Sequence, residues 1–338
     1  MKQQGLQSQS RRGLIALTVL VALLLAACGG SGSDGASKDA SATAGASSEA
    51  PGTVTIDHRF GSTEVPVDPE RIVSLDLQWT DVLLSLEKTP AAYIPDPTLG
   101  KDFPWQGDQL GDVTHLDATV ASGLPIEKIA AQKPDLIVVT YLAEDKAAYD
   151  KLAAIAPTIA SLAGDQVDTW QDITTAAGKV LGEPDKAEDL IADVDGQVAD
   201  VAAELPGLEG KTAAMANYVP GDALYIVSDP EDGANVLFSQ LGMSIPQSIL
   251  DAGTSQQGRV KLSLENVGIL DDADMLVLFT NGADPNDIPG YSSLHAVETG
   301  AVANLDYADV VSLNTPTPMS IPYGLEKIRP ALEAAAEG

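Results

Sequence analysis

Short apolar runs alternate with helically spaced apolar residues along much of this chain. Residues 71–75 and 135–140 are apolar runs of the length and type found in buried parallel strands. Residues 79–86 have helical spacing, and residues 126–130 predict a short helix just before the second run. Strand, helix and strand joined by short connections indicate an α/β layer structure.

The longest helical pattern lies near the middle of the chain. Apolar residues recur every three or four positions over residues 187–205, with acidic residues and Gln between them. Gly182 is expected to end the preceding helix, and Pro184 suits a first helical turn. A helix over residues 183–205 would be about 34 Å long, so it can pass from one half of the molecule to the other.

One sequence pattern of the first half returns in the second half. Glu127 is followed eight residues later by Asp135 and an apolar run. Glu265 is followed nine residues later by Asp274 and another apolar run. In both places a Glu begins a short helix and an Asp begins a strand, which favours two lobes built on the same plan.

The N-terminus has the pattern of an export signal. A basic start precedes an apolar run over residues 13–27, which as a helix would span about 22 Å, less than the roughly 30 Å core of a bilayer. The run ends in Leu-Ala-Ala-Cys28, which resembles the lipobox of bacterial lipoproteins and implies lipidation of Cys28. Residues 10–12 are similar to a twin-arginine signal, so two export routes stay open.

Residues 28–52 are predicted to be a flexible tether. Nineteen of these 25 residues are Gly, Ala, Ser or Thr, and none is a large apolar residue. Such a segment cannot bury enough surface to offset the entropy of ordering it. As a coil it would have a typical end-to-end distance of about 28 Å.

Composition excludes several classes of protein. The chain has 19 basic and 49 acidic residues, and the loss of residues 1–27 would leave 16 basic against 49 acidic, a net charge of −33. That charge argues against a nucleic-acid partner. A single Cys excludes an internal disulfide, a Cys-based zinc site and an iron–sulfur cluster. The motifs of serine hydrolases, P-loop enzymes and dinucleotide-binding enzymes are missing, so we expect no enzyme.

Several phrases, in this order, resemble the substrate-binding lipoproteins of ABC importers, and in particular the ferric-siderophore and vitamin B12 class. They are residues 71–75, 124–139, 152–158, 262–265 and 272–278. The resemblance runs from Thr53 to the end. It implies two Rossmann-like α/β lobes joined by one long interdomain helix, with the ligand cleft between the lobes. The implied division is a signal peptide (1–27), a tether (28–52), an N-terminal lobe (53–182), a connecting helix (183–206) and a C-terminal lobe (207–338).

The resemblance also implies a function and its partners. A lipid-anchored monomer on the extracytoplasmic face of the cell membrane would capture a ferric siderophore and deliver it to an ABC permease dimer with its ATPase. No cofactor would be intrinsic to the protein. In the family each lobe presents a glutamate to permease arginines, and by position these are Glu127 and Glu265. The alternative is that both are ordinary surface acids.

Few residues qualify as ligand contacts, since the chain has only 15 aromatic residues. Candidates lie at predicted strand ends, in loops expected at the cleft, or among the scarce cations: Trp79, Trp105, Tyr141, Tyr218, Arg259 and Met319. Each has an alternative role in a lobe core or on the surface. Trp170 is expected in the core, because it has helical spacing with neighbouring apolar residues.

The identity of the ligand stays open at this point. The three histidines, at positions 58, 115 and 295, lie far apart and in no metal-ligand spacing. Haem remains an alternative because Met319 lies in a candidate cleft loop, and cobalamin or another iron chelate is a further one. A charge of −33 repels anionic complexes, which favours a neutral or cationic hydroxamate chelate. The rival of another class is a surface lipoprotein without a transport role.

Overall fold

The computed structural model describes residues 52–338, except 118–122, 144, 164–167 and 254–257. The predicted signal peptide, the lipidation site Cys28 and nearly all of the predicted tether lie outside the described residues. The described residues belong to one compact unit. Within this part of the chain, no helix is both long and apolar enough to cross a membrane.

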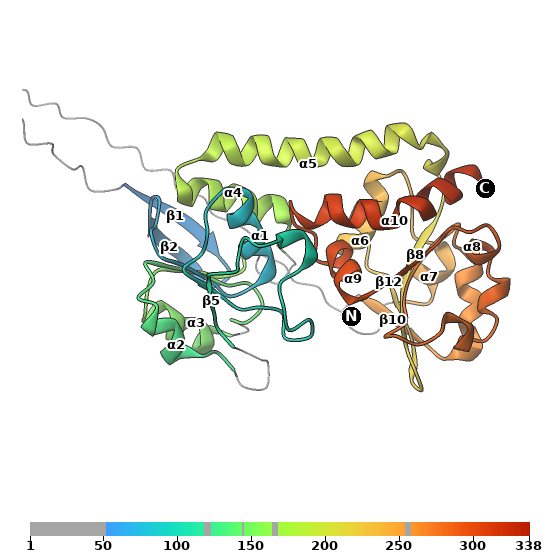
Figure 1. The fold of residues 1–338 in the computed structure, drawn as a ribbon, viewed down its shortest axis with the longest axis horizontal. Helices are drawn as coiled ribbons and strands as arrows, with labels where there is room; N and C mark the ends of the chain where they lie inside the picture. Colours follow the sequence, from blue (N-terminus) through green and yellow to red (C-terminus); the bar gives the residue numbers. More distant parts are fainter. Residues whose placement is uncertain (1–51, 118–122, 144, 164–167, 254–257) are drawn as a thin grey trace, which may run out of the picture. The chain divides into compact units, whose positions relative to one another are not determined.

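The first half, drawn in blue to green in Figure 1, contains a five-stranded parallel sheet. The strand order of this sheet is β5-β4-β3-β6-β7. Its strands are β3 (Ile72–Ser74), β4 (Ala92–Tyr93), β5 (Thr114–His115), β6 (Leu136–Val138) and β7 (Thr158–Ile159). The connecting helices are α1 (Leu77–Ser85), η1 (Pro104–Gln106), α2 (Ile126–Ala131), α3 (Lys146–Ala153) and α4 (Trp170–Leu181). A separate hairpin pairs β1 (Thr53–His58) with β2 (Gly61–Pro66). The central strands β3 and β6 are entirely buried, as their apolar runs predict.

The second half contains a mixed sheet in the order β10-β9-β8-β11-β12. Its strands are β8 (Ala213–Val219), β9 (Ala223–Val227), β10 (Arg259–Leu262), β11 (Met275–Phe279) and β12 (Val302–Leu305). Strands β8, β11 and β12 are parallel, whereas β9 is antiparallel to both of its neighbours. The β8–β9 pairing has a local reason: a tight turn joins β8 directly to β9, and a hairpin connection forces antiparallel pairing.

Helices and 3-10 turns complete the second half of the molecule. They are η2 (Pro206–Leu208), α6 (Gly233–Gln240), α7 (Gln247–Asp251), η3 (Leu264–Asp272), η4 (Pro285–Asp287), η5 (Tyr291–Ser293), α8 (His295–Glu298), α9 (Tyr307–Asn314) and α10 (Ser320–Glu337). The two α/β halves confirm the predicted fold class, with two sheets separated in sequence by one long helix.

That long helix is α5 (Pro184–Glu204). It begins and ends within one residue of the predicted range, 183–205. Gly182 adopts a left-handed conformation (φ 72°) at the end of α4, where a residue without Cβ is favoured. Ala187 packs in the apolar core of the first half, whereas Val194 and Val198 pack in that of the second half. Helix α5 therefore belongs to both cores. That residues 53–182 and 207–338 are separate domains stays a prediction.

The sequence repeat corresponds to the same kind of hydrogen bonding in both halves, made by an Asp carboxylate at the start of a strand. The Asp135 carboxylate accepts the backbone N–H groups of Glu70 (2.8 Å) and Arg71 (2.9 Å), just before β3. The Asp274 carboxylate accepts the backbone N–H (2.7 Å) and hydroxyl (2.8 Å) of Thr212, just before β8. Each Asp thus links the start of its own strand to the start of the neighbouring central strand, which fixes the register of the pair.

The contact between α4 and α5 yields a stability prediction with a matched control. A methyl group added at Gly178 of α4 would overlap Cβ of Ala187 in α5, whereas one added at Gly196 of α5 would meet nothing within 4 Å. We expect Gly178→Ala to lower the free energy of unfolding by about 1–3 kcal/mol through overpacking. Gly196→Ala should raise it by roughly 0.5–1 kcal/mol through helix propensity. Urea denaturation measures both; equal effects of the two substitutions would contradict the close packing.

Candidate functional site

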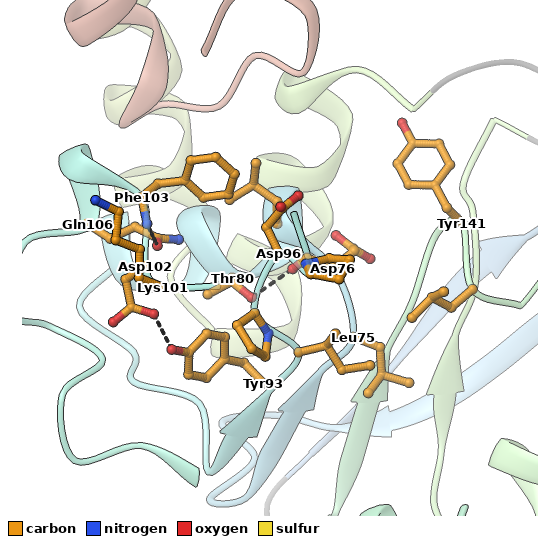
Figure 2. A pocket seen from close by; sticks show the side chains of 15 residues that line it. Leu75, Asp76, Thr80, Tyr93, Asp96, Lys101, Asp102, Phe103, Gln106 and Tyr141 are labelled. Carbon is orange, nitrogen blue, oxygen red and sulfur yellow. Dashed lines mark hydrogen bonds between the residues drawn. The ribbon is translucent and has the colours of Figure 1, made fainter. Parts of the chain in front are cut away.

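A pocket of about 290 Å³ lies at the carboxyl ends of the central strands of the first sheet (Figure 2). Leu75 and Asp76 follow β3, Asp96 follows β4, and Tyr141 follows β6; all four line the pocket. This edge is where open parallel α/β sheets bind ligands, because the loops of several strands converge there. We call it the first pocket.

Asp76 organises the floor of the first pocket. Its carboxylate caps α1 by accepting the backbone N–H of Trp79 (3.0 Å), and it also accepts the backbone N–H (2.8 Å) and hydroxyl (2.9 Å) of Thr140. The side chain therefore ties the end of β3 to the end of β6. Desolvation raises the pKa of Asp76 to about 6, although these hydrogen bonds oppose the shift.

Tyr93 forms one wall of the first pocket and is held by two polar partners. Its hydroxyl donates to the Asp102 carboxylate, as Figure 2 shows, and lies 2.8 Å from Nε2 of His115. Tyr93 and His115 are register partners in the neighbouring parallel strands β4 and β5, which explains why their side chains meet. Burial and the Asp102 charge raise the pKa of Tyr93, so this phenol stays protonated.

A buried carboxylate joins the first half to the second half beside this pocket. Asp81 of α1 has no solvent exposure. One oxygen accepts the indole N–H of Trp105 (2.7 Å) and the hydroxyl of Thr317 (2.7 Å), and the other accepts the side-chain amide of Gln106 (2.6 Å). Desolvation raises the pKa of Asp81 to about 6. We call Asp81 and these three donors the joint.

Three further contacts link the two halves. The hydroxyl of Tyr307 in α9 donates to Asp96 (2.9 Å). The side-chain amide of Gln78 donates to the carbonyl of Pro316 (3.4 Å). The Trp105 ring lies 5.3 Å from that of Tyr323, centroid to centroid. All of these second-half residues, like Thr317 of the joint, lie between residues 307 and 323, around the connection from α9 to α10.

A second pocket, of about 450 Å³, lies against the sheet of the second half. Asn217, Tyr225 and Arg259 line it together with Phe279 and residues of α9. The Arg259 guanidinium lies 3.6 Å from the Asp232 carboxylate.

Two predicted cleft residues have the expected surroundings, and two predictions are wrong. Tyr141 is 51% exposed and lines the first pocket, and Arg259 lines the second. Trp79 is fully buried, because it lies on the face of α1 that packs into the first-half core. Tyr218 is only 5% exposed, because successive residues of a strand point to opposite faces of a sheet: Asn217 lines the pocket and Tyr218 enters the core.

Trp105 and Met319 lie in the packing beside the first pocket. Trp105 stacks on Phe103 at 4.5 Å and belongs to the joint. Met319 packs against a small cluster that contains Tyr93 and Leu110. Ligand contact by either residue stays a prediction. Trp170, in contrast, is buried in a core, as expected, but it packs in the second-half core rather than with Ile173 and Val180 in that of the first half.

The remaining predicted residues lie on the surface or in local networks. Glu127 and Glu265 are exposed in the first turns of α2 and η3. His58 hydrogen-bonds through Nε2 to the hydroxyl of Thr63 (2.9 Å), and its ring lies 5.1 Å from that of Tyr149. Among the described residues, no three His, Cys, Asp or Glu side chains gather in a way that could hold a metal ion.

The sequence interpretation missed Asp76, Asp96 and Phe103 as pocket residues. Asp76 directly follows the first predicted strand, so its place at the carboxyl end of that strand could have pointed to it. Asp96 stands between two prolines, a sign of a rigid loop. Phe103 has no comparable local pattern.

Known proteins resemble the chain in sequence and structure. The sequence profile of a family described as "Periplasmic binding protein" matches residues 72–308. The "Probable siderophore-binding lipoprotein YfiY" of Bacillus subtilis is 29% identical over 272 residues, covering 79% of this chain and 78% of that protein. The ferric enterobactin-binding periplasmic protein FepB of Escherichia coli is 28% identical, covering 65% of this chain and 72% of its own. The crystal structure of a periplasmic solute-binding protein from Mycobacterium smegmatis is 27% identical in sequence, with a TM-score of 0.68. The match covers 84% of this chain and 99% of that chain.

The raised pKa of Asp81 gives a pH prediction whose sign follows from linkage. The carboxyl titrates near 6 when folded and near 3.8 ordinarily, so between these values the folded state binds the extra proton. Acidification from pH 7 to pH 5 should therefore stabilise the protein relative to the variant Asp81→Asn, by up to about 1.4 kcal/mol per pH unit below pH 6. Denaturation of both proteins across this range measures the difference. Parallel pH profiles would show that Asp81 titrates in its ordinary range.

Proposed function

The chain belongs to the periplasmic binding protein family, and from this premise we propose that it captures a ferric siderophore outside the cytoplasm and delivers it to an ABC import permease. The observation that carries the proposal is the first pocket. It lies at the carboxyl edge of a parallel sheet, next to contacts that join the two halves, and it combines an exposed Tyr141 with the aromatic walls Tyr93 and Phe103. Such walls suit a bulky, largely preformed chelate.

The charges around the pockets favour a hydroxamate chelate. The first pocket is lined by three aspartates, at positions 76, 96 and 102, and by one cation, Lys101. The second is lined by Asp222 and one cation, Arg259, which has Asp232 beside it. An anionic tris-catecholate complex needs several guanidinium groups for charge neutralisation and stacking. A neutral or cationic hydroxamate complex needs none.

The site of action is the membrane surface. The Cys28 lipobox and the tether of residues 28–52 support a lipid anchor on the extracytoplasmic face. A tethered receptor of this family would then meet its permease by diffusion over a short range. The exposed carboxylates of Glu127 and Glu265 are proposed to set its orientation there, because each begins the short helix that precedes the corresponding strand of its half, β6 or β11.

Ligand class is tested by titration with ferrioxamine B and with ferric enterobactin, followed by quenching of Trp fluorescence. We expect tighter binding of ferrioxamine B. Tyr141→Ala should weaken it about tenfold, since the exposed ring supplies contact area, whereas Tyr141→Phe should retain most of the affinity. The Phe variant is the matched control, because it loses only the hydroxyl bond to Gln78 (3.2 Å). Tighter binding of the catecholate complex would contradict the proposed ligand class.

Permease docking is tested by charge reversal. The double variant Glu127→Arg, Glu265→Arg should abolish uptake of the ferric chelate by cells while leaving the affinity of the purified protein for the chelate unchanged. The control reverses two exposed acids of α5, Glu188→Arg and Asp200→Arg, and should preserve uptake. If uptake survives the first double reversal, or fails equally in the control, the docking role of the two glutamates is wrong.

A further inference from the structure

One hydrogen bond between the two halves joins a residue that lines the first pocket to the helix that lines the second. Tyr307 begins α9, and Val310 and Asn314 of the same helix line the second pocket. Positions 307, 310 and 314 are three and four residues apart, so they share one face of the helix. The hydroxyl of Tyr307 donates to Asp96, which lines the first pocket. The Tyr307–Asp96 bond therefore lies between side chains that line the first pocket and side chains that line the second.

The acceptor of this bond is held rigidly. One Asp96 oxygen accepts the backbone N–H groups of Thr98 and Leu99, both at 2.8 Å, and the other accepts from Tyr307 at 2.9 Å. Prolines flank Asp96 on both sides and restrict its backbone. On the donor side, the Tyr307 ring lies 6.3 Å from that of Phe279, which lines the second pocket. Both partners are thus positioned by contacts within the protein.

The two pockets are individually small for a siderophore complex. Their volumes are about 290 Å³ and 450 Å³; sites for drug-sized ligands span roughly 300–1,000 Å³, so the first pocket lies just below this range and the second in its lower half. A hexadentate iron chelate needs the upper part of this range, so we expect it to extend over both spaces when it is well buried. A small chelate can be held in one of them. In this arrangement we expect only the first kind of ligand to meet the Tyr307–Asp96 bond.

We propose that the Tyr307–Asp96 hydrogen bond determines the size selectivity of the cleft: large chelates must break it to span both pockets, and small chelates bind with it intact. This inference rests on the proposed function and adds to it the residue pair that sets ligand size. Both side chains are only partly buried, so water can replace each partner when the bond opens. The bond then disfavours large ligands without excluding them.

The experiment compares a large and a small ferric hydroxamate, ferrioxamine B and ferric tris(acetohydroxamate), by Trp fluorescence titration. Tyr307→Phe keeps the ring and removes the donor. It should tighten binding of ferrioxamine B about tenfold, equivalent to about 1.4 kcal/mol, and leave the small chelate unchanged. Asp96→Asn keeps a weaker bond and should give an intermediate gain. It also covers the case in which Tyr307→Phe folds poorly, which its melting temperature would reveal.

Tyr323→Phe is the matched control. It also removes a tyrosine hydroxyl that donates to an aspartate, Asp309 (2.7 Å), but both partners lie in the second half. It should change the affinity for neither chelate. The inference is overturned if Tyr307→Phe shifts both affinities equally or neither, while the unmodified protein binds ferrioxamine B. If the unmodified protein binds neither chelate, the proposed function fails and this inference fails with it.

Discussion

The burial of the Asp81 carboxylate is the constraint on which the arrangement of the cleft depends. A carboxylate without access to water must be satisfied by protein donors. Asp81 takes them from two segments: Trp105 and Gln106 of η1 in the first half, and Thr317 of the second half. If one segment moves, the buried carboxylate loses a hydrogen-bond donor, at a cost of about 1.5–3 kcal/mol. The joint therefore holds α1, η1 and the start of α10 at fixed positions.

Helix α1 connects the Asp81 hydrogen bonds to the first pocket. Asp76 caps its N-terminus and binds Thr140 after β6, and Asp81 lies little more than one turn further along the same helix. One short helix thus connects the floor of the pocket with the contact between the two halves. Burial raises the pKa of both carboxyls to about 6, so near neutral pH both are ionised against a desolvation penalty that their donors offset. Such an arrangement favours a defined geometry over maximal stability.

How much the sequence predicted depends on the range of the interactions involved. Helix α5 and its Gly182 terminus follow from local periodicity and backbone preference, and both were predicted. Asp135 and Asp274 were recognised because the same pattern, a Glu followed by an Asp and an apolar run, occurs twice in the sequence. The partners of Asp81 lie up to 236 residues away, and no local pattern reports such pairing. Trp79 and Tyr218 were misplaced for a different reason: the position at a strand end was right, but the direction of the side chain depends on core packing.

The contacts between the two halves differ in how readily they can open. The Asp81–Thr317 bond is buried, so opening it leaves a desolvated charge with one donor fewer. The Tyr307–Asp96 bond is partly exposed, so water takes over both partners and the net cost of opening it is only about 1.4 kcal/mol. Helix α5, which packs in both cores, further opposes a large change in the separation of the halves. A ligand entering the cleft therefore meets a fixed frame at the joint and α5. We therefore expect a bound ligand to displace side chains between the two pockets rather than the joint, because opening the Tyr307–Asp96 bond costs less free energy than opening the Asp81–Thr317 bond.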